Sequence, residues 1–189
     1  MHPRLAEIVN ELERTRAGLL ETVASATSSP VPPPGKWSVA EVLDHLAIVE
    51  QSVAGLMRKL VERAGDSLEA ETSEESVLDS LDYPALADRS SRIDAPDSMR
   101  PRTGVGLDQA HAALDASRVS LVEAIERADG RALGSLSFPH RVFGPLDLYQ
   151  WLLFVVQHEE RHRRQIEELI GNREQTFSES DNALDKERE

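Results

Sequence analysis

The sequence predicts an all-α fold, because apolar residues recur at helical spacing in four segments, near residues 4–25, 38–63, 107–127 and 146–170. No segment alternates convincingly as a strand would, and we find no internal repeat. The helical pattern fails between residues 65 and 103, so a long crossover joins the second and third helices. The chain has 189 residues, which is the size of one domain.

The first helix carries one buried stripe and no residue that suggests chemistry. A proline-rich segment at residues 30–35 ends it, because proline lacks the amide proton and disfavours helix in the residue before it. We expect this helix to serve packing through Leu5, Ile8, Val9, Leu12, Leu19, Leu20 and Val23.

The second helix begins at a capping box, in which the Ser38 hydroxyl and the Glu41 carboxylate satisfy each other's orphan backbone amides. Trp37 and Val42 are spaced as a hydrophobic staple across this start. His45 falls at the border of the buried stripe. It is either a flank histidine with its edge in water or a metal ligand, and histidines elsewhere in the chain must decide between the two.

The crossover at residues 65–103 is acidic and rich in serine, with one short apolar cluster. We expect a short helix near residues 74–81 and a solvated surface over the rest.

The third helix carries Arg118 and His111 near the edge of its apolar stripe. We expect Arg118 to pair with a carboxylate or with a crossover carbonyl, since a guanidinium is tolerated near a core only when it is paired. His111 is either a fourth metal ligand or an ordinary histidine bonded to backbone or water.

The fourth helix places His158 and His162 one turn apart on its inner face. Two imidazoles in this arrangement can hold one metal ion, whereas uncoordinated histidines there would need other hydrogen-bond partners. Together with His45 they supply the three nitrogen ligands that bind a divalent ion and leave positions open for water or substrate.

Gln165 lies beside both histidines on the helical wheel. It either orients a ligand imidazole or a metal-bound water, with Glu159 or Glu50 as a further partner, or it only joins the helices. Glu159 is also a candidate base, because His158 to His162 fits the His-Glu-x-x-His pattern of zinc proteases. The longer form of that motif is not met, since this chain has Gln165 where the motif needs a glycine and Glu168 where it needs a third histidine.

Composition excludes several functions. A net charge of −13 and a pI near 4.9 argue against nucleic acid and anionic membrane as partners. No long apolar run and no signal-peptide pattern is present, so we expect a soluble cytoplasmic protein. Without cysteine, any metal site must use nitrogen and oxygen, and any thiol must arrive with a substrate. Residues 172–189 are polar, and we expect disorder at their end.

The order and spacing of several motifs resemble the DinB-like superfamily: Trp37-Ser38 before His45, Ala95-Pro96 and Pro101 in the crossover, His140-x-x-x-Gly144-x-Leu146, and the run from His158 to Ile166. The resemblance spans residues 1–171, which we expect to form a single domain. It implies a four-helix bundle with a long crossover between helices two and three, often a homodimer. It also implies a divalent metal held by His45, His158 and His162. Family members often have His-Pro where this chain has His140-Arg141, which leaves the role of His140 open.

The resemblance implies a class of chemistry more than one reaction. Some relatives are thiol-dependent transferases or isomerases, and others are metal-dependent hydrolases. We expect zinc, nickel or iron as the ion, activating a low-molecular-weight thiol or water for transfer or hydrolysis on a small-molecule substrate. The alternative is a non-catalytic dimeric bundle that binds a metal or a small molecule. Access separates the two, because an enzyme needs an open coordination position that faces a cavity.

Overall fold

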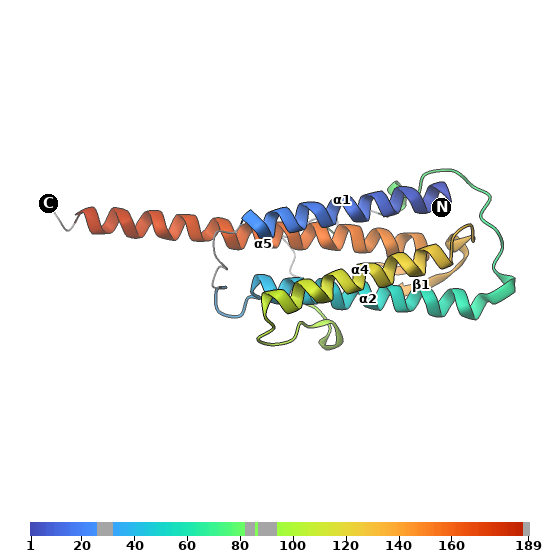
Figure 1. The fold of residues 1–189 in the computed structure, drawn as a ribbon, viewed down its shortest axis with the longest axis horizontal. Helices are drawn as coiled ribbons and strands as arrows, with labels where there is room; N and C mark the ends of the chain where they lie inside the picture. The colour runs from blue at the N-terminus through green and yellow to red at the C-terminus, as the bar shows by residue number, and fades with distance from the viewer. Residues whose placement is uncertain (26–31, 82–85, 87–93, 187–189) are drawn as a thin grey trace.

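The bundle consists of long helices that run side by side (Figure 1). A computed structural model describes residues 1–25, 32–81, 86 and 94–186. In this part of the chain four long helices are present: α1 (Pro3–Ser25), α2 (Val39–Ala64), α4 (Leu107–Arg127) and α5 (Leu148–Lys186). The predicted all-α fold is confirmed, and the first three helices begin and end within about one residue of the expected positions. None of the described helices is both long enough and apolar enough to cross a membrane.

The start of α2 forms as the sequence predicts. The Ser38 hydroxyl accepts a hydrogen bond from the Glu41 backbone amide at 3.2 Å, and the Glu41 carboxylate accepts one from the Ser38 amide at 2.8 Å. This reciprocal capping fixes where α2 begins. It therefore also fixes the position of His45, which lies two turns further along the helix.

The last helix, α5, differs from its expected bounds at both ends. It begins at Leu148, and its backbone stays helical to Lys186, so that it extends beyond the bundle (Figure 1). We expected the helix to end near residue 170, before a polar tail. Gly171 alone does not end it, and no proline follows to remove a helical amide.

A two-stranded antiparallel hairpin precedes α5, which corrects the expectation of a chain without strands. Strand β1 (Ser137–His140) pairs with β2 (Gly144–Asp147), with Phe138 opposite Leu146. Gly144 has a φ of +74°, which a residue with a side chain rarely adopts. The Trp151 indole N–H donates to the Phe138 carbonyl at 3.1 Å and holds the hairpin against α5.

The expected helix near residues 74–81 is wrong: only the 3₁₀ turn η2 (Leu78–Ser80) forms there. Arg4 of α1 explains the difference. Its guanidinium donates to the Glu75 carbonyl, at 2.8 Å, and to the side chains of Glu71 and Ser73. Because these contacts tie the segment to α1, the carbonyl of Glu75 is not free for a helical bond. Further turns lie at η1 (Gly65–Ser67), η3 (Asp97–Met99) and η4 (Leu133–Ser135).

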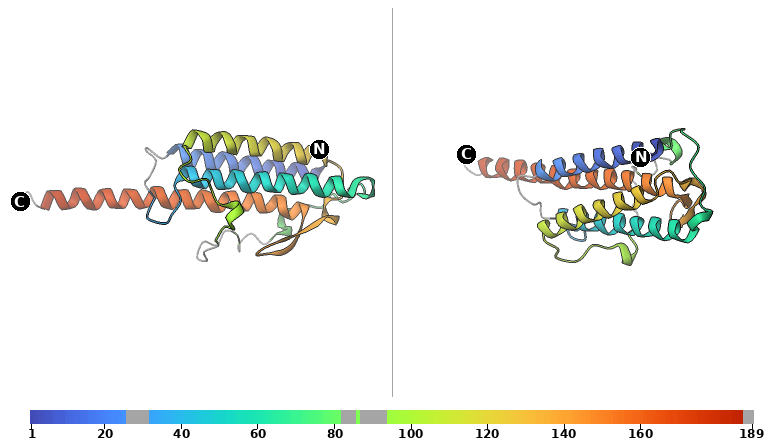
Figure 2. Two further views of the ribbon diagram at one scale, coloured as in Figure 1. Left: turned by 90° about the horizontal axis from the view of Figure 1, so that it is seen from below. Right: turned by 45° about the vertical axis from the view of Figure 1, so that its right-hand side comes forward.

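Helix α2 packs chiefly against α4, and α1 against α5, and α2 and α5 also meet (Figure 2). The core between the helices has two apolar clusters. One surrounds Leu12, Met57, Leu121 and Leu153, and the other surrounds Leu19, Leu43, Leu114 and Ile166. Buried polar side chains lie between these clusters on all four helices. They are Thr15, Arg16, Glu50, Ser117, Gln157, Glu159, Arg161 and His162.

We predict that Leu121→Ala lowers the free energy of unfolding by about 2–5 kcal/mol, because Leu121 is fully buried and its loss leaves a cavity. Val119→Ala on the same helix is the control. Val119 is 59% exposed, so its change should stay within about 0.5 kcal/mol. Urea unfolding measures both, and similar values for the two variants would contradict this packing.

Candidate metal centre

The structure brings His45, His158 and His162 together. His45 comes from α2, and the other two come from consecutive turns of α5. One ligand nitrogen from each lies within 4.8 Å of the others. The Nε2 atom of His158 is 3.2 Å from Nε2 of His45 and 3.2 Å from Nε2 of His162. His45 and His162 are buried, whereas His158 keeps a partly exposed edge. His111 does not belong to this cluster.

The outer ring nitrogens of two histidines have acceptors that decide the tautomer. Nδ1 of His45 is 2.6 Å from the carbonyl oxygen of Met99, and Nδ1 of His162 is 2.8 Å from Oε1 of Gln165. Both partners are acceptors, so each Nδ1 carries the proton and donates it. Each Nε2 then presents a lone pair toward the other rings. The Gln165 amide thus contacts a ring of the cluster, and its role toward a metal stays a prediction.

The donor set fits a divalent ion. Two nitrogens bound at about 2.0–2.1 Å to one tetrahedral ion lie about 3.3–3.4 Å apart, close to the 3.2 Å observed from His158 to each neighbour. Three lone pairs that face one another without a cation would repel, and a proton on His158 could relieve that repulsion toward only one neighbour. Neutral imidazole is a ligand for zinc, nickel and iron.

The protonation states also suit a metal site. Burial pushes the pKa of His158 well below its usual value, and the neighbouring His162, His45 and Arg161 lower that pKa further. Burial also lowers the pKa of His45, although the Met99 carbonyl and Asp44 act in the opposite direction. Both rings are therefore neutral near pH 7, which is the form that binds metal.

Aromatic rings flank the three histidines. Trp37 lies 4.9 Å from His45 between ring centroids, and Phe154 stacks on His158 at 5.2 Å. His140 of β1 contacts Phe154 at 4.6 Å, and its Nδ1 accepts hydrogen bonds from backbone amides of its own turn. His140 therefore accepts hydrogen bonds within the turn of the hairpin and packs against Phe154. It does not belong to the cluster of His45, His158 and His162.

Glu159 and Glu50 belong to a buried ion-pair network beside the histidines. Arg16 donates to Glu159 at 2.6 Å and to Glu50 at 3.0 Å. Arg118 donates to Glu50 at 2.6 Å and to Glu159 at 3.2 Å. The expectation that Arg118 pairs with a carboxylate is confirmed. The Glu159 oxygens are thus engaged by the two guanidinium groups, whereas Gln165 contacts a ring of the cluster directly.

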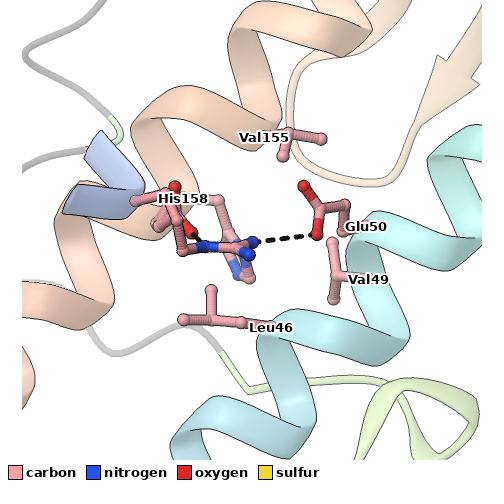
Figure 3. Close-up of a pocket in the computed structure, with 7 residues that line it drawn as sticks. Leu46, Val49, Glu50, Val155 and His158 are labelled. Atoms are coloured by element: carbon pink, nitrogen blue, oxygen red, sulfur yellow. Dashed lines mark hydrogen bonds and ion pairs between the residues drawn. The ribbon is translucent and has the colours of Figure 1, made fainter. Parts of the chain in front are cut away.

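A small pocket of about 10 Å³ separates this network from the histidines. In Figure 3 His158 and Glu50 lie on opposite sides of the pocket, with Val155 above, Leu46 below and Val49 on the side of Glu50. Arg16 and Glu159 complete the lining. Its size is about that needed for one water molecule, and the charged lining offers it hydrogen-bond partners.

Sequence reasoning missed Arg16 as part of the site's surroundings, although a signal was present. Arg16 lies four residues after Leu12 and three before Leu19, which is a core position of the α1 stripe. Glu50 has the same relation to Leu46 and Val53 on α2. A charge at a core position of each of two helices indicates a buried pair.

Comparison with known proteins agrees with this fold. A family model described as the DinB superfamily matches residues 11–166. The "Uncharacterized protein YuaE" of Bacillus subtilis (strain 168) is 27% identical over 163 residues, which is 86% of this chain and 94% of that protein. The crystal structure of TT2238, a four-helix bundle protein, superposes with a TM-score of 0.56 at 24% identity, over 86% of this chain and 98% of that one. The last likeness supports the four-helix-bundle fold.

We predict that the metal-free protein loses stability as the pH falls below about 6.5, the ordinary pKa of histidine. Because the pKa values of His158 and His45 are lowered in the folded chain, the unfolded chain binds protons there that the folded chain does not. Stability is therefore complete above this pH and declines below it. Urea unfolding between about pH 7.5 and 5.5 measures the slope. His158→Gln should flatten it and His111→Gln should not, whereas equal slopes in all three proteins would contradict the assignment.

Proposed function

The chain belongs to the DinB superfamily, and on that premise we propose that it binds one divalent metal ion through His45, His158 and His162. We further propose that it is an enzyme, which uses the ion to activate a thiol or water for transfer or hydrolysis on a small molecule. Zinc, nickel and iron are the candidate ions.

The convergence of the Nε2 atoms carries this proposal. Three imidazoles from two helices point one nitrogen each at a common centre, and hydrogen bonds to Met99 and Gln165 keep two of those nitrogens unprotonated. An ion held there would supply Lewis acidity, which lowers the pKa of a thiol or of water and polarises an acceptor group. Three protein ligands leave a coordination position open, as catalytic sites require and enclosed structural sites do not.

The chain's own side chains prepare the site. Trp37 and Phe154 cover two of the rings and reduce their contact with water. The missing cysteine means that a thiol nucleophile must come from a second substrate. We propose a low-molecular-weight thiol for that part. The homodimer, and the absence of nucleic-acid and membrane partners, stay predictions.

A zinc-protease function has less support. In that class the glutamate of His-Glu-x-x-His acts as the base. Here the corresponding Glu159 accepts hydrogen bonds from Thr15, Arg16 and Arg118, and burial leaves it 2% exposed. Because its carboxylate oxygens already accept these hydrogen bonds, they are not free to accept a proton from a metal-bound water.

We predict that the purified protein binds one divalent ion per chain and that a thiol-transfer or hydrolysis activity disappears on chelation and returns with metal. Elemental analysis measures the first, and substrate panels with metal present and removed measure the second. His158→Gln should lose the ion because two ligands hold it far less well than three.

His111→Gln is the matched control and should keep both the ion and the activity. A wild-type protein that binds no divalent ion at micromolar concentration would contradict the proposal. Metal binding without any metal-dependent reaction would favour the non-catalytic bundle instead.

We predict that Gln165→Leu weakens metal binding by about ten- to a hundredfold, because the amide orients the His162 ring. Gln157→Leu is the control. Gln157 is also a buried amide of α5, but its side chain has no hydrogen-bond partner among the residues that the structure describes, so its loss should leave metal affinity unchanged. Competition titration with a chelating dye measures both variants, and equal affinities would reduce Gln165 to a packing role.

A further inference from the structure

The residue before His45 is a buried carboxylate. Asp44 is 1% exposed, yet it lies on α2 next to a candidate metal ligand. Its oxygens accept three kinds of hydrogen bond from one partner, Arg102. The Arg102 backbone amide donates at 2.8 Å, its Nε at 3.1 Å and its Nη2 at 2.6 Å. Burial raises the pKa of Asp44, but the hydrogen bonds and charge of Arg102 outweigh burial and leave the pKa below its ordinary value.

The same part of the crossover also contacts His45. The Met99 carbonyl accepts the hydrogen bond from Nδ1 of His45 at 2.6 Å. Met99 ends the turn η3, which is closed by hydrogen bonds from the Met99 amide to the Pro96 carbonyl and from the Arg100 amide to the Asp97 carbonyl. Asp44 and His45, which are adjacent on α2, therefore contact Arg102 and Met99 of one short segment, residues 97–102.

The two contacts depend on each other for geometric reasons. Met99 ends the turn η3 and lies only three residues from Arg102, so the short connection through Arg100 and Pro101 restricts how far its carbonyl can move. The rest of Arg102 is exposed, and its side chain has 62% relative solvent accessibility. Its side chain therefore contacts the bundle mainly through Asp44. Without the Arg102 side chain, Asp44 would lose its counter-ion and keep only the hydrogen bond from the backbone amide of residue 102, which would weaken the contact that keeps the segment on α2.

We propose that the Asp44–Arg102 ion pair is a latch that holds residues 97–102 against α2, so that the Met99 carbonyl fixes His45 with its Nε2 lone pair toward the metal. Asp44 and Arg102 are then positioning residues for a centre that they do not touch. The inference rests on the proposed metal site. By linkage, metal binding must in turn stabilise the docked segment.

Arg102→Ala in the full chain tests the latch, because Arg102 itself is exposed and its side chain contacts the bundle through Asp44. Metal affinity should fall by about tenfold, as when a residue that orients a ligand is lost. Arg100→Ala is the control: Arg100 is two residues away, and in the described part of the chain its ion pair joins it to the exposed Asp97. Its affinity should equal that of the wild type. Arg102→Lys should recover part of the loss, since it restores the charge but not the forked contact.

A second readout does not need the metal. Imidazole nitrogen chemical shifts of the metal-free protein report the tautomer of His45, which should be protonated at Nδ1 alone in the wild type and in Arg100→Ala. In Arg102→Ala both tautomers should be populated. Asp44→Asn, which keeps the shape of the side chain and removes its charge, should change the tautomer in the same direction.

If Arg102→Ala and the wild type bind the ion with equal affinity, the latch proposal is wrong, but the proposed metal site is not affected. If the wild type binds no ion, the proposed function fails, and the tautomer alone decides the inference. His45 held in one tautomer in the wild type and released in Arg102→Ala supports the latch, whereas the same tautomer in both overturns it.

Discussion

The structure depends on a ring of four buried charges, one from each long helix. Arg16 of α1 and Arg118 of α4 each contact both Glu50 of α2 and Glu159 of α5. A buried charge without its partner costs about 3–5 kcal/mol, so the helices are stable only in the rotation and register that keep all four contacts. Apolar side chains tolerate small shifts between helices, but hydrogen-bonded charges do not. The ring therefore determines how the four helices face one another.

That register also places the candidate metal site. Glu159 follows His158 directly on α5, and Glu50 lies five residues after His45 on α2. When the ring sets how α2 and α5 face each other, His45 and His158 meet at their Nε2 atoms. The core thus has two apolar clusters with these charged side chains beside them. One small pocket lies between the charged residues and His158 (Figure 3). The same four ion pairs therefore stabilise the bundle and set the geometry of the candidate metal site.

The features that could be predicted from the sequence are those that local periodicity specifies. The bounds of the first three long helices, the capping box at Ser38 and the inward phase of His158 and His162 depend on residues a few positions apart. The hairpin was missed because its strands have four residues each and no clear alternation of buried and exposed side chains. Met99 could not be found at all, since its contribution is a backbone carbonyl that any residue could provide. The path of the crossover is set by distant partners such as Arg4 and Asp44, which no local pattern reveals.

The central claim is that one ion is held by three imidazoles of a single chain. X-ray absorption spectroscopy of the zinc-loaded protein measures the ligands directly, because imidazole rings scatter in a pattern distinct from carboxylates. The account predicts nitrogen at about 2.0–2.1 Å with the scattering of three imidazoles, together with loss of one imidazole in His45→Gln. A spectrum with one imidazole or none, and with oxygen ligands in their place, would contradict it.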